Sequence, residues 1–371
     1  MSSPDESRDP SERHSDDGET ERAALWGSLG ANASLIADLE ARWKLSPGSL
    51  IGRVTRVDRG RFQVLTTAGP SAVGTSGISP VCVGDWCVLE ESDGAANYEL
   101  IEVLPRRTAL VRQSSGTRTE VQALAANIDS VMVVVPLDRP ISRRQIERFL
   151  AMAWDSGALP VLVLTKTDLV DDAVADEART EVGTVSRDVP VHSVSVVSDV
   201  GMEAVRGQCQ PGSTVALLGT SGSGKSSLVN TLMGSDVVQT GDVRQSDAKG
   251  RHTTAWRELL VVPGGGVLID TPGLRELGMW IADDGIDAVF TDITDLEALC
   301  RFNDCAHESE PDCAVVDAIA NGTLDPERLA SYRKLISEAA YAERQNDHRL
   351  ARDNQKVGRQ RAAEGRRKSR P

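Results

Sequence analysis

A glycine-rich segment near the middle of the chain has the residue types needed to hold a row of phosphates. Residues 219–226 match the pattern G-x-x-x-x-G-K-[ST]. An apolar stretch, 214–218, precedes them and a predicted helix follows, so backbone N–H groups and a helix N-terminus converge on one point. We expect Lys225 to contact the β- and γ-phosphates, as the catalytic cation, and Ser226 to ligate Mg²⁺. The alternative, a structural glycine turn, is disfavoured by this strand-and-helix context. The predicted phosphate-binding residues are Gly219, Thr220, Ser221, Gly222, Ser223, Gly224, Lys225, Ser226 and Ser227.

A second segment is suited to the metal ion and the terminal phosphate. Asp270-Thr-Pro-Gly273 directly follows an apolar stretch. An aspartate at a strand end can hold Mg²⁺ through water, and the Gly273 N–H can contact the γ-phosphate. Between this segment and the glycine-rich loop lie residues 250–254, Gly-Arg-His-Thr-Thr, in which Thr253 and Thr254 are candidate Mg²⁺ ligands. Taken by itself, that stretch could equally be an ordinary loop.

A third segment indicates which base is bound. Thr165-Lys-Thr-Asp168 follows the apolar stretch 161–164 and is similar to the N-K-x-D motif of GTPases. Asp168 would accept hydrogen bonds from guanine N1–H and N2–H₂, which adenine lacks, and Lys166 would cover the face of the base. Thr165 replaces the usual Asn, so one contact near the purine is weakened or comes from the hydroxyl. Ser195 lies where a loop that binds the guanine carbonyl is expected. The alternative for residues 165–168 is an ordinary helix N-cap after a strand.

A cysteine and histidine cluster near the C-terminus favours a metal ion. Three thiols and one imidazole occur within 14 residues, at Cys300, Cys305, His307 and Cys313. Four such ligands complete the tetrahedral coordination of a structural Zn²⁺ and leave no open position for catalysis. The remaining cysteines, Cys82, Cys87 and Cys209, fall in or beside predicted strands, and we interpret them as buried apolar residues.

The elements that would position most of these residues form an α/β pattern. Continuous Val, Leu and Ile runs joined by amphipathic helices indicate a parallel sheet covered on both faces. The helix expected first covers residues 142–154. The predicted buried strands are 130–135, 161–164, 191–194, 214–218, 259–262 and 267–269.

The part of the chain before this pattern has a different rhythm. Short alternating segments at 51–54, 61–65, 85–89 and 98–104 are separated by Gly, Asp and Ser turns, which predicts a small antiparallel barrel. Five short strands in about 65 residues would suit an OB-fold, although an SH3-like barrel would give a similar pattern. Arginines near the first predicted hairpin could contact nucleic acid or could simply be solvated charge: Arg53, Arg56, Arg59 and Arg61.

Length and composition set the limits of this organisation. The 371 residues suffice for two or three domains, and the net charge of −14 argues against a protein that coats nucleic acid over its whole surface. No apolar run approaches the roughly 20 residues that span a bilayer, and no signal peptide is evident. We therefore expect a cytoplasmic, soluble monomer that does not associate with membranes. The predicted division is a disordered acidic tail (1–22), a helical extension (23–47), an OB-fold barrel (48–112), a nucleotide-binding domain (113–280), a helical zinc-binding domain (281–340) and a basic tail (341–371).

The order of the motifs is itself informative. In ordinary GTPases the phosphate loop precedes the guanine motif, whereas here residues 165–168 precede residues 219–226. The same sheet can be built from either order if the original termini lie close together. The sequence therefore predicts a circularly permuted P-loop GTPase domain.

With these motifs in view, the chain resembles the ribosome small subunit-dependent GTPase family, RsgA. The resemblance covers residues 48–340 and rests on the barrel, the permuted motifs and the cysteine cluster, with further similarity at 83–86, 104–107 and 250–254. It implies a GTP hydrolase that acts in late maturation of the small (30S) ribosomal subunit and is stimulated by that subunit. It also implies GTP and GDP as ligands, Mg²⁺ with GTP, one structural Zn²⁺, and rRNA as a partner. The basic tail supports that partner modestly, because residues 341–371 hold ten Lys and Arg against four Asp and Glu.

One residue needed for hydrolysis is missing from its usual place. A Gln just after D-x-x-G orients the attacking water in Ras-like enzymes, and here Leu274 follows Gly273. We therefore expect slow intrinsic hydrolysis. His252, beside the two threonines, is the nearest candidate to position the water, although it could merely cap or pack its loop.

Two other functions remain open at this level. A P-loop ATPase or kinase would need no guanine motif. A non-catalytic, GTP-sensing, RNA-binding assembly factor would bind the nucleotide without turning it over.

Overall fold

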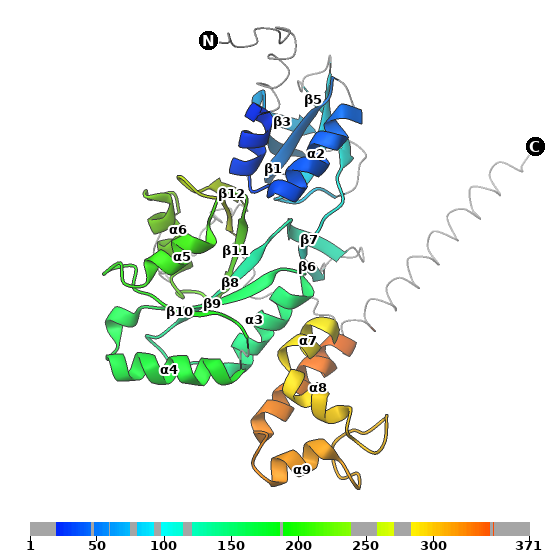
Figure 1. The fold of residues 1–371 in the computed structure, drawn as a ribbon, viewed down its shortest axis with the longest axis vertical. Coiled ribbons are helices and arrows are strands. Elements are labelled where there is room, and N and C mark those ends of the chain that lie inside the picture. Colours follow the sequence, from blue (N-terminus) through cyan, green and yellow to red (C-terminus); the bar gives the residue numbers. More distant parts are fainter. Residues whose placement is uncertain are drawn as a thin grey trace, which may run out of the picture.

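The chain is represented by a computed structural model, which describes residues 20–45, 48–58, 60–74, 80–92, 98–113, 121–185, 188–238, 258–270, 283–341 and 344. Figure 1 shows three bodies along the long axis. They are a β-rich body with N-terminal helices at the top, an α/β body in the middle, and a helical body at the bottom.

A twisted, mostly parallel sheet forms the middle of the molecule. Its strands are β8 (Ser130–Pro136), β9 (Leu159–Thr165), β10 (Val191–Ser193), β11 (Thr214–Gly219), β12 (Glu258–Val261) and β13 (Val267–Asp270). They lie in the order β10-β9-β8-β11-β13-β12, and β12 alone among these six runs antiparallel to its neighbour in the sheet, β13. Every residue of β8 and β11 is buried, which is expected of parallel strands covered on both faces.

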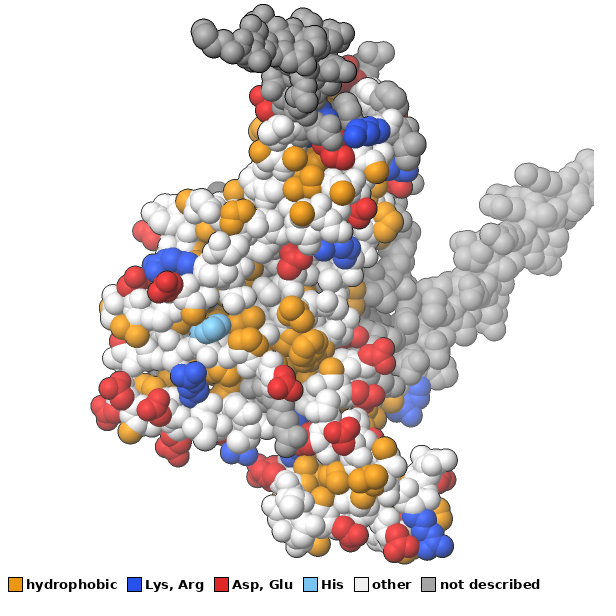
Figure 2. Space-filling model, in the orientation of Figure 1, with side chains coloured by type: hydrophobic (Ala, Val, Ile, Leu, Met, Phe, Trp, Pro, Cys, Tyr) orange, Lys and Arg blue, Asp and Glu red, His pale blue; other side chains and the backbone are white. Residues whose placement is uncertain are grey.

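Helices cover both faces of this sheet. They are α3 (Arg143–Asp155), α4 (Asp172–Val185), α5 (Met202–Gln208) and α6 (Lys225–Met233). Alternate residues of β8 point to opposite faces: Val133 packs in one core with α3 and α4, whereas Met132 packs in the other with α5 and α6. The α/β class predicted from the sequence is confirmed. The outer side of α4 is acidic, as Figure 2 shows at the lower left.

The β-rich body is built from five antiparallel strands. They are β1 (Leu50–Asp58), β2 (Arg61–Thr66), β3 (Gly69–Gly74), β4 (Trp86–Glu91) and β5 (Tyr98–Val103). They pair in the order β3-β2-β1-β4-β5, and β3 also approaches β5. This order agrees with an OB-fold, which remains our interpretation of the body. β3 was absent from the strands expected by alternation, since it begins Gly-Pro and has a single buried residue.

Two N-terminal helices complete the β-rich body. Residues 20–28 are helical, and α2 (Ala33–Leu45) follows. Trp26 and Leu29 are buried against Ile51 and Trp86 of the barrel. The helical extension is therefore part of the barrel's packing. Residues 1–19 of the predicted acidic tail, like 345–371 of the basic tail, lie outside the described residues.

A buried arginine joins the barrel to the parallel sheet. The Arg53 side chain is 0% exposed and donates to the carbonyl of Leu29, to the Asn127 carbonyl at 3.0 Å and to the Thr214 hydroxyl at 2.8 Å. Arg53 therefore cannot be one of the surface cations considered from the sequence, because its donors are committed to buried oxygens from three regions of the chain.

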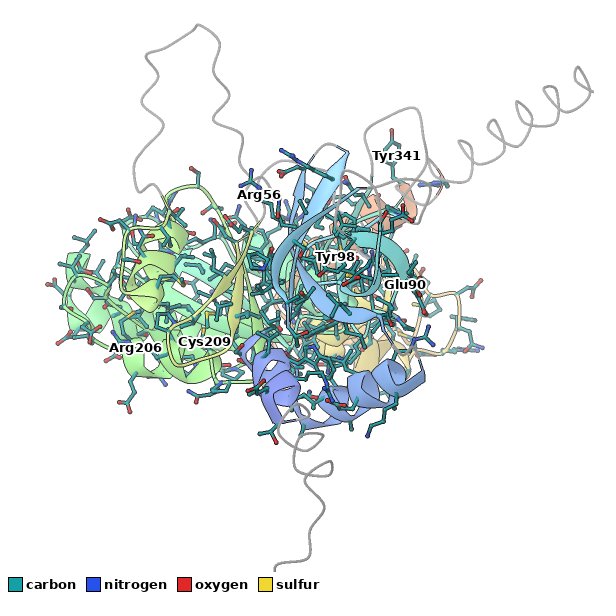
Figure 3. The ribbon with its side chains drawn as sticks, turned by 90° about the horizontal axis from the view of Figure 1, so that it is seen from above. Arg56, Glu90, Tyr98, Arg206, Cys209 and Tyr341 are labelled. Carbon is teal, nitrogen blue, oxygen red and sulfur yellow. The ribbon has the colours of Figure 1, made fainter. Side chains whose placement is uncertain are left out.

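The two sheets are also continuous. Arg56 of β1 pairs with Glu258 of β12, so barrel and α/β body share one hydrogen-bonded sheet. Seen from above, Arg56 lies on the side of the barrel toward the α/β body, away from Tyr98 and Glu90 (Figure 3). A movement of β1 would therefore be transmitted through this pairing to β12, the strand that follows residues 239–257.

One of the remaining elements crosses a predicted domain boundary, and another packs across one. The hairpin of β6 (Ala109–Gln113) and β7 (Val121–Ala126) spans residue 112. The helical body contains α7 (Asp283–Val289), α8 (Thr291–Glu297), α9 (Ala314–Ala320) and a helix at 326–341. Helix α7 packs on α3 of the α/β body, so the two bodies share one apolar core. The boundaries stay predictions.

Among the helices of the described ranges, none combines the length and apolarity required to cross a bilayer.

Candidate nucleotide and metal sites

The glycine-rich loop connects β11 to α6 in the geometry that a phosphate site needs. Gly219 has φ +152°, and a Cβ there would lie 2.5 Å from the Val134 carbonyl oxygen of β8. Gly224, with φ +95°, is the N-cap of α6. Lys225 Nζ donates to the carbonyls of Gly219 and Thr220, both at 2.7 Å. The ammonium is thus held over the loop, where phosphate oxygens could replace the carbonyls.

The turn after β9 presents a carboxylate at the same edge. Asp168 lies in a 3₁₀ turn, η1 (Thr167–Leu169), and is exposed. Its Oδ1 accepts a hydrogen bond from the Ser195 hydroxyl at 2.6 Å, and Ser195 is 1% exposed. Ser195 therefore orients Asp168 and is itself covered. Lys166, at φ +63°, adopts the left-handed conformation that non-glycine residues seldom take outside functional turns.

The base turn and the phosphate loop are in direct contact. Thr165 is 2% exposed and donates to the backbone carbonyl of Ser223 at 2.7 Å. Their strands are held in register by β8, because Pro136 pairs with Thr165 and Val134 pairs with Gly219. Two segments that are more than 50 residues apart in the chain thus form one surface.

A third turn reaches both of these loops, and the sequence analysis missed it. Asp138, two residues beyond β8, forms an ion pair with Lys166, and that hydrogen bond holds the pKa of Asp138 below its ordinary value. Arg139 donates to the Ser221 carbonyl at 3.0 Å. The available signal was positional: charged residues just past a buried strand lie at the edge where the other strands place their loops.

The predicted metal and switch residues are only partly described. Asp270 ends β13, half-buried, and Ile269 pairs with Ala216 of β11, so Asp270 points to the same edge as the phosphate loop. Lys225 and Ser226 form the first turn of α6. Five further residues considered for Mg²⁺, the γ-phosphate or hydrolysis lie outside the described residues: His252, Thr253, Thr254, Gly273 and Leu274. The described strands β8, β9, β11 and β13 are parallel and all have their carboxyl ends at one edge of the sheet, the edge where sheets of this kind bind nucleotides.

The cysteine and histidine cluster is brought together as predicted. One ligand atom from each of Cys300, Cys305, His307 and Cys313 lies within 4.8 Å of all the others. The Sγ atoms of Cys300 and Cys313 are 3.9 Å apart, and His307 Nδ1 is 3.6 and 3.5 Å from them. Tetrahedral bonds of Zn–S length require ligand separations of about 3.8 Å. The donor set and its spacing fit a metal ion of that size.

Groups around the cluster orient its ligands. His307 Nε2 is 2.8 Å from Glu297 Oε1, and the Tyr332 hydroxyl donates to Glu297 Oε2 at 3.2 Å. A carboxylate behind a ligating imidazole fixes the tautomer that exposes Nδ1 to the metal. Desolvation, together with the neighbouring thiols, raises the pKa of the Cys305 thiol to about 11. Metal binding would therefore release protons from this cluster.

A buried charge network joins the helical body to α3. Arg328, on the helix at 326–341, donates to Glu147 Oε1 of α3 at 2.8 Å and to the Asp292 carboxylate at 3.0 and 3.1 Å. Its guanidinium lies 4.3 Å from the centre of the Phe290 ring, and that ring packs on Tyr332. Tyr332 in turn contacts Glu297, so packed side chains run continuously from the metal cluster to the helix beside the nucleotide sheet.

Comparison with known sequences identifies close relatives. A family model described as RsgA GTPase matches residues 103–280. The small ribosomal subunit biogenesis GTPase RsgA of Streptomyces avermitilis is 46% identical over 338 residues, covering 89% of this chain and 90% of that protein. The protein of the same name from Opitutus terrae is 48% identical over 279 residues, covering 73% of this chain and 76% of that protein.

Solved structures show the same architecture. The crystal structure of YjeQ from Thermotoga maritima matches with a TM-score of 0.59 and 26% identity, covering 79% of this chain and 99% of that one. YloQ, described as a circularly permuted GTPase, matches with a TM-score of 0.56 and 22% identity, covering 79% of this chain and 95% of that one, which shows the fold alone. The circular permutation predicted from the order of the motifs is confirmed.

Proposed function

The chain belongs to the RsgA family of GTPases and hydrolyses GTP, and from this membership we propose that it acts in late maturation of the small (30S) ribosomal subunit, whose binding stimulates hydrolysis. The relatives named for biogenesis of that subunit are matched over most of their length, which supports the proposal. We propose that the protein acts in the cytoplasm and as a monomer.

Guanine selectivity rests on Asp168 in this proposal. Its exposed carboxylate, oriented by Ser195 at 2.6 Å, would accept from guanine N1–H and N2–H₂. Adenine offers an acceptor at N1 and no 2-amino group, so it would leave this carboxylate unpaired. This oriented carboxylate beside the phosphate loop is the observation that carries the proposal against an ATPase or kinase.

The phosphates and the metal ion would be held by the loop and the ends of two strands. Backbone N–H groups of residues 219–227 would surround the phosphates, and Lys225 would leave its loop carbonyls for the β- and γ-phosphate oxygens. Ser226 and Asp270 would hold Mg²⁺, with Thr253 or Thr254 as a further ligand. The Mg²⁺ ion would neutralise the charge that develops on the phosphate oxygens during transfer.

The attacking water needs an orienting group that residue 274 cannot supply. A leucine there has no hydrogen-bonding atoms, so intrinsic hydrolysis should be slow. We assign the orienting role to His252, brought into place when the subunit binds. Gly273 would contact the γ-phosphate through its backbone N–H.

The metal in the cysteine cluster is proposed to be one structural Zn²⁺. Three thiolates and an imidazole are the ligands that zinc prefers, and they fill all four tetrahedral positions. The ion would stabilise the loop between α8 and α9, with no part in the chemical step.

The rRNA contact is assigned to local basic segments. The face in Figure 2 carries charges of both signs and no continuous basic patch. Because the net charge is −14, we propose that rRNA binding depends on locally concentrated cations, such as the ten Lys and Arg of residues 341–371.

Turnover with and without small ribosomal subunits tests the function most directly. We expect subunits to stimulate hydrolysis of labelled GTP. Unlabelled GTP and GDP should compete with the labelled nucleotide, and ATP should not. His252→Ala should lower subunit-stimulated kcat by about two orders of magnitude, the usual contribution of a residue that positions or activates a reacting group, and leave the Kd for GDP unchanged. His192→Ala, on β10, is the matched control. An unchanged kcat for His252→Ala would remove that assignment, absence of turnover would favour the GTP-sensing factor, and competition by ATP would favour the ATPase.

A further inference from the structure

Thr165 makes a buried hydrogen bond between the base turn and the phosphate loop. It is the last residue of β9, it is 2% exposed, and its hydroxyl is 2.7 Å from the Ser223 carbonyl oxygen. The next nearest acceptor is the Val135 carbonyl oxygen at 3.4 Å. Both acceptors belong to the protein backbone, one in β8 and one in the phosphate loop.

The number of donor hydrogens decides what this side chain can do for a ligand. A threonine hydroxyl has a single hydrogen to donate, whereas the side-chain amide of an asparagine has two. The hydrogen of Thr165 is already directed to Ser223 at a distance typical of a good O–H···O bond. Purine N7 is an acceptor and would need a donor hydrogen of its own.

The carbonyl that Thr165 binds belongs to the part of the loop next to the catalytic lysine. Ser223 is 0% exposed, and its own hydroxyl lies 3.3 Å from Lys225 Nζ. On the other side, Asp168 is only three residues after Thr165. The hydroxyl therefore links the group that recognises the base to the group that binds the phosphates.

The other contacts between these segments are exposed and weaker. Arg139 and Asp138, which reach the phosphate loop and Lys166, have side chains 44% and 32% exposed. Ion pairs at that level of exposure are screened by solvent and salt and contribute little. Among the described residues, the Thr165 hydrogen bond is thus a buried side-chain contact that links the two loops directly, in addition to the strand register that β8 provides.

We propose that Thr165 is a positioning residue that ties the guanine-binding turn to the phosphate loop and donates no hydrogen bond to the base. Purine N7 then receives no hydrogen bond from this position. The inference rests on the proposed GTP site and adds to it. Guanine is recognised through its Watson–Crick edge by Asp168, while Thr165 sets affinity for any nucleotide that uses both loops.

The first experiment uses the unmodified protein and asks whether N7 matters. Binding of GDP and of 7-deaza-GDP to the full-length chain should give Kd values within about twofold of each other. A fivefold or larger preference for GDP would mean that a donor reaches N7, and it would overturn the proposal. Because no substitution is needed, this comparison does not depend on any variant folding.

The second experiment changes the hydroxyl. Thr165→Val removes the donor with little change of shape and should weaken GDP and GTP equally, by about tenfold, which corresponds to about 1.4 kcal/mol. In subunit-stimulated turnover the loss should appear as a raised KM rather than a lowered kcat, because the contact is the same in the ground and transition states. Thr165→Ser keeps the donor and should restore wild-type binding. Equal weakness of the Ser and Val variants, or an unchanged Kd for Val, would overturn the proposal.

A third measurement separates failure of this inference from failure of the GTP site. Xanthine carries an oxygen where guanine has its 2-amino group, so Asp168→Asn, which can donate to that oxygen, should shift preference from GDP to XDP. If that variant shows no shift, the assignment of Asp168 fails while the 7-deaza and Thr165 results stand. If the shift occurs and Thr165→Val has the wild-type Kd for GDP, only the positioning role of Thr165 is refuted.

Discussion

The nucleotide site and the metal cluster are assembled in opposite ways. The cluster takes its four ligands from 14 consecutive residues, 300–313, and needs only two turns and a helix start to bring them together. The nucleotide site takes residues from the ends of β8, β9, β11 and β13, and depends on hydrogen bonds such as Thr165 to Ser223, 58 residues apart. The first is a local structure that a metal can hold, whereas the second exists only when the whole sheet has formed.

The difference has a consequence for how each site should respond to damage. A local site should lose its ligand when one donor is removed, with little effect elsewhere. A site held by tertiary contacts should respond to changes far away in the sequence. Contacts run from Glu297 through Tyr332 and Phe290 to Arg328 and Glu147, and we call them the bridge. The bridge connects the metal cluster to α3, the helix beside the nucleotide sheet, so damage to it could affect both sites.

The largest expected effect comes from removing one metal ligand. Cys305→Ser should abolish retention of zinc under a weak chelator, because structural zinc in small Cys/His domains contributes about 10–16 kcal/mol of binding free energy that depends on all four donors. Zinc content after dialysis and hydrogen exchange across 298–313 measure the loss. The Kd for GDP should stay within about twofold, since no cluster ligand reaches the phosphate loop.

Cys209→Ser is the matched control for that substitution. Cys209 is a buried cysteine of the α/β body, 2% exposed, outside the cluster, and its replacement should leave zinc content unchanged. The contrast between local and assembled sites would fail if Cys305→Ser retained zinc, or if it weakened GDP binding as strongly as it weakened zinc binding.

The same contrast explains what could be predicted from the sequence. The cysteine and histidine cluster and the glycine-rich loop could be predicted because each is defined by spacing within a few residues. The circular permutation was also predictable, since the order of motifs is a property of the chain. Asp138 and Arg139 were missed because nothing in their own segment indicates a ligand. They matter only because β8 lies beside both β9 and β11.

Buried polar partners were the least predictable feature. Arg53 was considered as a surface cation, because it is one of four arginines near the first predicted hairpin. In the fold it bonds Thr214, 161 residues away, and Arg328 bonds Glu147, 181 residues away. Such pairs depend on how the folded parts of the chain pack against one another. Periodicity and composition of the sequence do not indicate this packing.

A smaller effect is expected from cutting the bridge between the two sites. Arg328→Gln would leave Glu147, 2% exposed, without its cation, and removal of one partner from a buried ion pair costs about 3–5 kcal/mol. The amides of the helix at 326–341 should exchange faster by a corresponding factor. The double variant with Glu147→Gln should recover part of the loss, because it removes the uncompensated carboxylate.

Lys334→Gln, on the same helix, is the control for that experiment. Lys334 is exposed and its pair with Glu338 spans 3.9 Å, so the substitution should change stability by less than about 0.5 kcal/mol. Equal effects of the Arg328 and Lys334 variants would show that the bridge contributes nothing beyond a surface contact, and the two bodies would then be energetically independent.

The smallest effect, and the most specific, is expected behind the metal cluster. Glu297→Gln keeps the shape of the side chain but replaces the carboxylate that accepts from His307 Nε2 at 2.8 Å. Groups in this position usually contribute 10- to 100-fold to metal affinity by fixing the imidazole tautomer, so the zinc Kd should rise by about that factor. Competition with a chromogenic chelator measures it directly.

Glu310→Gln is the control, because Glu310 accepts only from backbone N–H groups of the same loop and has no contact with the imidazole among the described residues. If both variants lost zinc equally, Glu297 would merely support the loop. If only Glu297→Gln lost zinc, the cluster would depend on one carboxylate from α8, outside its own 14 residues, and would be less local than its ligand spacing suggests.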